Sequence, residues 1–115
     1  MKSKVILDVP LRVDSGDFLH LDAPLTGLDE VMTDEPELTF TLEYPFEKPY
    51  AGTIKTAKGA TRRQIIDAIR TGFRTMYAAT TETGGTYGRA HQRLDHLFID
   101  RIALDDDVLE IVVTT

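Results

Sequence analysis

The segment TRRQIIDAIRTGFRTMYAA (61–79) decides the fold of this 115-residue chain. Its large apolar residues recur at three- and four-residue spacing, which places them on one face of an α-helix. Thr61 and Gln64 have the spacing of a capping box, which predicts that the helix begins there. Burial of the apolar face contributes roughly 7–15 kcal/mol before opposing terms, so this face must pack on a sheet. It consists of Ile65, Ile66, Ile69, Phe73 and Met76, and Gly72 among them predicts a close approach to a strand.

Alternation of apolar and polar residues predicts strands on both sides of this helix. The predicted strands are KVILDVPLRV (4–13), FLHL (18–21), ELTFTLEY (37–44), LFIDRIAL (97–104) and VLEIVV (108–113). In the first of them, the odd-numbered residues Val5 to Val13 would share the buried side. The turn residues DSGD (14–17) predict a hairpin between the first two strands, and DDD (105–107) predicts one between the last two.

Two further segments connect these elements. The acidic segment 22–37 carries apolar residues at near-helical spacing, which predicts a helical turn over the core or, alternatively, an exposed partner-binding element. Tyr87, Ala90, Leu94 and Leu97 recur at three- and four-residue spacing, which predicts a short second helix over about residues 88–96.

The element order is then β-β-β-α-α-β-β, which predicts an α+β fold. We expect a mainly antiparallel sheet of about five strands, packed on one long helix and a short second helix. A β-grasp-like arrangement satisfies this order. The length predicts one α+β domain over residues 1–115.

Composition excludes several function classes. The chain has no cysteine, which excludes disulfides, thiolate metal sites and a cysteine nucleophile. Its serines are Ser3 in the N-terminal tail and Ser15 in a turn, which disfavours a serine hydrolase. No apolar run reaches the roughly 18 residues of a membrane span, and the N-terminus lacks a signal-peptide pattern. We therefore expect a cytoplasmic protein that has no membrane partner.

Charge is distributed unevenly along the chain, whose net charge is −6. Residues 1–47 hold three Lys/Arg against eleven Asp/Glu, residues 48–101 hold ten against four, and residues 102–115 hold none against four. Either these stretches lie against each other in the fold, or they form surfaces of opposite sign. The negative total makes nucleic acid an unlikely partner, because such binding depends on neutralising phosphates.

The helix carries a candidate anion- or partner-binding patch. Arg63, Arg70 and Arg74 fall within about 40° of one another around the helix. Guanidinium groups bind carboxylates and phosphates through forked hydrogen bonds. Arg89 and Arg93 would extend the patch if the second helix folds back. A solvated helix face, partly neutralised by Asp67, explains the same spacing.

His91 and Asp95 are the candidate catalytic residues. At i and i+4 they would share a helical face, as a general base and its orienting carboxylate or as a stabilising surface pair. His91 and His96 are five residues apart, which does not let both bind one metal on a helix or a strand. A metal would need ligands such as His20 or Asp100, and nothing indicates that they converge. We therefore predict no metal and no cofactor.

Three segments together resemble a family of short uncharacterised proteins of plants, fungi and bacteria. They are LTFTLEYP (38–45), GATRRQIIDAIRTGFRTMY (59–77) and YGRAHQRLDHLFIDRIAL (87–104). The shared features are a Thr-initiated helix and a Tyr-Gly-x-x-x-His segment that leads into a strand. Members often carry a tryptophan before the glycine–histidine pair, and this chain has none. The resemblance implies that Tyr87, Gly88 and His91 are typical of the family, and it implies no activity.

These observations predict a small non-enzymatic protein–protein interaction domain. It would bind another protein, or itself, through charge-polarised surfaces and an exposed sheet edge. The alternative is an anionic small-molecule binding or catalytic domain that uses His91, Asp95 and the arginines. A third, weaker hypothesis is a nucleic-acid-associated module that uses the arginine face.

Overall fold

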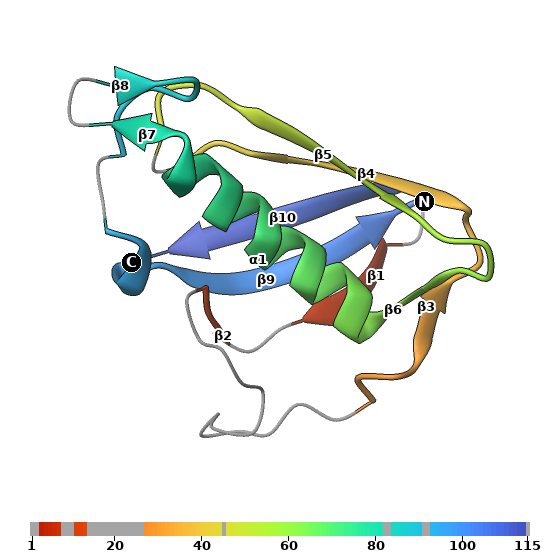
Figure 1. Ribbon diagram of the computed structural model, residues 1–115. Helices are drawn as coiled ribbons and strands as arrows, with labels where there is room; N and C mark the ends of the chain where they lie inside the picture. The colour runs from red at the N-terminus through yellow and green to blue at the C-terminus, as the bar shows by residue number, and fades with distance from the viewer. Residues whose placement is uncertain are drawn as a thin grey trace.

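A computed structural model describes residues 3–7, 11–13, 27–44, 46–81, 84–90 and 93–114. One α-helix, α1 (Arg62–Ala78), lies across one face of the main sheet (Figure 1). The strands of that sheet are β1 (Ser3–Leu7), β2 (Leu11–Arg12), β4 (Glu37–Leu42), β5 (Tyr50–Lys55), β9 (Phe98–Asp105) and β10 (Val108–Thr114). Two small strand pairs accompany it: β3 (Val31–Thr33) with β6 (Ala60–Thr61), and β7 (Thr80–Thr81) with β8 (Gly84–Gly85).

The main sheet is mixed, with the spatial order β1-β9-β10-β4-β5, and β2 also pairs with β9. Every pair is antiparallel except β10 with β4, which is parallel. The predicted α+β class and mostly antiparallel sheet are confirmed. It follows from the pairings that β5 and β9 run in the same direction, so α1 is the crossover between them.

The helix forms as its sequence predicts. Thr61 accepts a hydrogen bond from the Gln64 N–H, and the Gln64 side chain accepts one from the Thr61 N–H. The five predicted apolar residues are all fully buried. A Cβ on Gly72 would lie 2.8 Å from Leu42 Cδ1 and 3.2 Å from Tyr50 Cε1. This confirms that the glycine lets α1 approach β4 and β5 closely.

The strands around the helix follow the predicted alternation in β4, where Leu38, Phe40 and Leu42 are buried. The hairpin between β9 and β10 is also confirmed, with Asp106 in the left-handed region at φ 55° in a two-residue turn. The first strand differs from the prediction. Its pairing with β9 shifts between Val5 and Leu7, so that Ile6 and Leu7 are both buried while Val5 is 40% exposed.

The predicted second helix over 88–96 is wrong. Residues 86–90 form a turn followed by irregular chain, and one short 3₁₀ turn, η2 (Leu94–His96), follows. Gly88 is in the left-handed region at φ 79°, which a helix does not allow. The Tyr87 carbonyl accepts hydrogen bonds from the Glu47 and Lys48 N–H groups at 3.2 and 3.0 Å. Contacts with a distant loop therefore replace the hydrogen bonds of a helix.

Other predictions fall partly or wholly on residues outside the described ranges. They include the turn at 14–17, the strand at 18–21 and residues 22–26 of the acidic segment. The described part of that segment contains a turn in which the Glu30 N–H donates to the Gly27 carbonyl at 3.0 Å, followed by β3. Leu28 and Met32 pack on the core, as expected for a segment that covers it.

We predict that Gly52→Ala destabilises the protein by about 1–3 kcal/mol, since a Cβ at this position would overlap the ring of Phe40. Thr53→Ala, at the next and exposed position of the same strand, is the control and should change stability by less than about 0.5 kcal/mol. Urea unfolding monitored by circular dichroism measures both. An equal effect of the two substitutions would contradict the packing of Phe40 on Gly52.

Candidate functional site

The main sheet has two halves, β1-β9-β10 and β4-β5, which separate from each other at one end. The parallel pairing of β4 with β10 covers only Val108 with Thr39 and Leu109 with Phe40. Beyond this point β4 continues to Leu42 beside β5, and β10 continues to Thr114 beside β9. Figure 1 shows the two strands diverging toward these ends. We call the space between the diverging strands the wedge.

The wedge contains a cavity of about 200 Å³. Its walls are Thr41, Leu42, Glu43, Tyr44, Phe73, Ile111 and Val113. Leu42 and Phe73 are buried, whereas Glu43 is exposed and Tyr44 is 48% exposed at the rim. Apolar side chains therefore form the inner wall, while Thr41, Glu43 and Tyr44 add polar groups, and Glu43 is the one charged residue among those that line the cavity.

The backbone of β10 directs hydrogen-bonding groups into the wedge. A two-residue turn closes the β9–β10 hairpin, so Asp105 and Val108 form a hydrogen-bonded pair. Hydrogen-bonded pairs recur at every second residue of an antiparallel ladder, so the even-numbered residues of β10 direct their amides toward β9. Odd-numbered residues direct theirs toward β4. The Thr39 N–H correspondingly donates to the Asp107 carbonyl at 2.9 Å. Within the described residues, no strand pairs with Ile111 or Val113 on this side.

An unpaired strand edge beside a cavity with an apolar inner wall is suited to binding an extended chain. The N–H and C=O groups of Ile111 and Val113 would form a ladder with it, and its alternate side chains would enter the cavity. Nothing in the described part of the chain groups three or more His, Asp or Glu residues in an arrangement that could hold a metal ion. No helix within the same residues combines the length and apolar composition that a membrane crossing requires.

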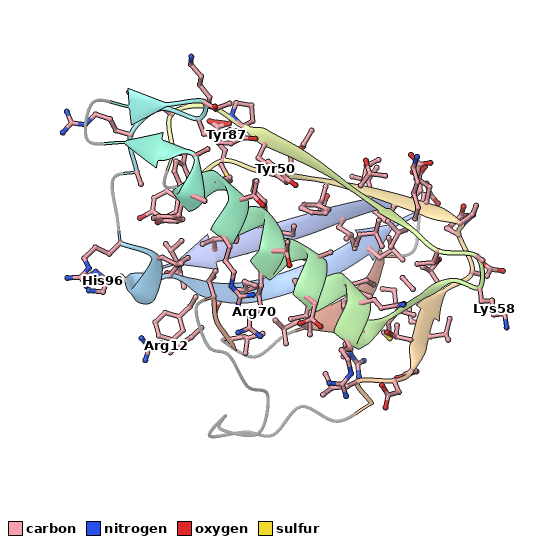
Figure 2. The ribbon with its side chains drawn as sticks, viewed as in Figure 1. Arg12, Tyr50, Lys58, Arg70, Tyr87 and His96 are labelled. Atoms are coloured by element: carbon pink, nitrogen blue, oxygen red, sulfur yellow. The ribbon has the colours of Figure 1, made fainter. Side chains whose placement is uncertain are left out.

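The predicted arginine patch is divided by the fold. Arg70 is buried at 3% exposure, and its Nε–H donates to the Val13 carbonyl at 3.1 Å, from α1 toward the end of β2 (Figure 2). The expectation that Arg70 faces solvent beside its neighbours is therefore wrong. The long side chain of Arg70 leaves the helix at the margin of its apolar face. The guanidinium is therefore buried against the rest of the fold and does not extend into solvent.

The other helix arginines are exposed and far apart. Arg63 forms an ion pair with Asp29 at 3.3 Å, at the start of α1. Arg74 is exposed eleven residues further on, about 16 Å along the axis, which is too far for both to bind one small anion. Arg62, which sequence reasoning missed, pairs with Glu30 at 3.7 Å and donates to the Ile6 carbonyl at 2.8 Å. The acidic and basic stretches thus meet within the chain at this point.

The remaining predicted site residues lie in or near the segment before β9. Arg89 and Arg93 are exposed, and the Arg89 N–H donates to Glu47 Oε1 at 2.7 Å. His91 and the side chain of Asp95 lie outside what the structure describes, as does His20. The proposed base and carboxylate pair, and anion binding by Arg74, Arg89 and Arg93, therefore stay predictions.

Two residues that the family resemblance marked have structural roles. Tyr87 packs on Tyr50 with ring centroids 5.7 Å apart, and Figure 2 shows the two side chains next to each other. A Cβ on Gly88 would lie 2.7 Å from the Glu47 side chain. Both residues hold the chain before β9 against the loop that precedes β5.

We predict that Arg70→Ala lowers the free energy of unfolding by about 2–4 kcal/mol. The substitution leaves a cavity and removes the buried donor to the Val13 carbonyl. Arg74→Ala on the exposed side of the same helix is the control and should stay within about 0.5 kcal/mol of the original protein. Chemical denaturation measures both variants. If Arg70→Ala leaves the free energy of unfolding unchanged, the guanidinium of Arg70 does not stabilise the fold.

Comparison with known proteins adds no family or fold assignment: no protein family model, curated protein or solved structure matches this chain. The resemblance that rests on Tyr87, Gly88 and His91 stays a prediction.

Proposed function

We propose that this protein is a small non-enzymatic protein-binding domain that accepts an extended segment of a partner in the wedge between β4 and β10. The observation that carries the proposal is the unpaired edge of β10 at Ile111 and Val113, beside a cavity lined by Leu42 and Phe73. Strand addition uses such an edge for affinity and the adjacent pocket for specificity.

The size of the cavity favours a peptide segment over a small molecule. Pockets that enclose drug-sized ligands measure roughly 300–1,000 Å³, whereas this cavity measures about 200 Å³. It has room for one or two apolar side chains of an extended segment. The alternative of an anionic ligand is less well supported, because no arginine lines the cavity and its one charged wall is Glu43.

The expected partner segment alternates apolar and basic residues. Its apolar side chains would enter between Leu42 and Phe73, and those between them would point outward past Glu43. The net charge of −6 also attracts a positively charged partner over longer distances. Two or three backbone pairs and one or two buried side chains correspond to weak binding, with a Kd of about 10 µM–1 mM.

We predict that a synthetic seven-residue peptide of alternating valine and lysine binds the wedge. Titration followed by amide NMR should shift the signals of Glu43, Ile111 and Val113, because the ladder forms at these groups. A peptide of the same composition with its lysines grouped together is the control for alternation and should bind more weakly. Equal binding of both peptides, or shifts centred on the outer edge of β5 at Ala51 and Thr53, would contradict the proposal.

Glu43→Lys tests the electrostatic part of the same proposal. It should weaken binding of the valine–lysine peptide about two- to fivefold and strengthen binding of a valine–glutamate peptide by a similar factor, as expected for an exposed ion pair. Glu37→Lys, at the other end of β4, makes the same charge change outside the cavity and should leave the preference unchanged. An identical response of the two variants would assign the effect to net charge and would refute recognition at Glu43.

A further inference from the structure

We infer that two copies of this chain pack against each other through the face of the main sheet opposite α1, with Arg101 of each copy paired to Glu110 of the other. This face is separate from the wedge, and the inference does not rest on the proposed function.

The face opposite α1 exposes large apolar side chains. Val5, Val108 and Val112 are 40%, 46% and 51% exposed, and the strand pairings place all three on this side. Their uncharged neighbours on the same face are Thr39, Thr41, Ala51, Thr53 and Ala103. The same pairings place Asp105 beside Val108, and Glu37 opposite Lys55 further along the face. No described element covers this face in Figure 1. Exposed apolar side chains on one face of a sheet are a feature of protein interfaces.

The charged residues of this face are complementary to those of the same face on a second copy. Arg101 lies opposite Val112, and Glu110 lies opposite Ala103, so the two charged residues are diagonal neighbours on β9 and β10. Both are exposed, and neither forms an ion pair with another described residue. The same face also holds Arg12, Lys55, Glu37 and Asp105, so cations and anions both occur on it. A surface that carries both signs matches a second copy of itself better than it matches a partner of single charge.

A twofold axis satisfies this arrangement. If two faces meet with the axis passing between Arg101 and Glu110, each arginine faces the partner's glutamate, and the axis passes close to Val112 of each copy. A twofold interface requires such reciprocal contacts. Two sheets packed in this way lie about 10 Å apart, as in a β-sandwich. Val112 and Ala103 of the two copies then meet along the axis, Val5 and Val108 contribute apolar contacts further out, and the two ion pairs fix the orientation.

The experiment is sedimentation equilibrium over a concentration series, which should give a mass twice that of the 12.9 kDa chain. Arg101→Glu and Glu110→Arg each place like charges opposite one another, so each variant alone should raise the dimer Kd at least about tenfold. The double variant should restore the dimer. An equimolar mixture of the two single variants should form a heterodimer, because both cross-interface pairs again carry opposite charges.

Arg74→Glu and Asp67→Arg are the matched controls, since they make the same charge changes on exposed positions of α1. Both should dimerise as the original protein does. The trans-rescue in the mixture separates a lost contact from misfolding, because two misfolded variants would not restore each other. A monomeric original protein, or single variants that do not dimerise with each other, would overturn the inference. Peptide binding by monomeric Arg101→Glu tests the wedge separately.

Discussion

The packing of α1 across both halves of the sheet is the contact on which this structure depends. The halves β1-β9-β10 and β4-β5 are joined directly by only two parallel residue pairs, Val108 with Thr39 and Leu109 with Phe40. The helix supplies the remaining connection. Gly72 lets it lie against Leu42 and Tyr50 on one half, while Phe73, also at a wall of the cavity, is fully buried at the divergence of β4 and β10. A bulkier residue at position 72 would therefore separate the helix from β4 and β5.

The wedge follows from the same packing. For β4 and β10 to pair along their full length, Leu42 would have to approach Ile111, and the core beneath them would have to rearrange. Protein interiors are close-packed and resist such changes. The cavity between Leu42, Phe73 and Ile111 is thus the space left where two strands diverge over a filled core. Because both strands have neighbours on their other sides, the backbone groups that face the wedge are held in a fixed orientation.

Sequence reasoning succeeded where structure depends on neighbours in the chain. Alternation over residues 37–42 and helical spacing over residues 62–78 are local signals, and both elements form as expected. The second helix failed because its spacing came from separate contacts: Tyr87 packs on Tyr50, whereas Leu97 is buried in the core. The left-handed backbone of Gly88 and the hydrogen bonds of Tyr87 to a loop some forty residues away are not visible in that spacing.

The candidate site was less predictable for the same physical reason. A helical wheel places Arg70 beside Arg63 and Arg74, but it contains no information about the Val13 carbonyl that binds the buried guanidinium. The wedge depends on the parallel register of β4 and β10, which are separated by more than sixty residues. The individual strands could be read from alternation, whereas their partners could not. The sequence therefore predicts an exposed sheet edge, but the position of that edge depends on which strands pair with each other.

Strand β10 contributes to two surfaces because its geometry has a period of two. The backbone groups of Ile111 and Val113 face the wedge, while the side chains of Val108, Glu110 and Val112 lie on the face opposite α1. A partner strand in the wedge would bind mainly the backbone groups of β10. Side-chain substitutions on the face opposite α1 do not remove these groups. A second copy of the chain would bind side chains from positions whose amides already pair with β9. The two contacts thus use different atoms of the same strand, and occupation of one does not require the other to be empty.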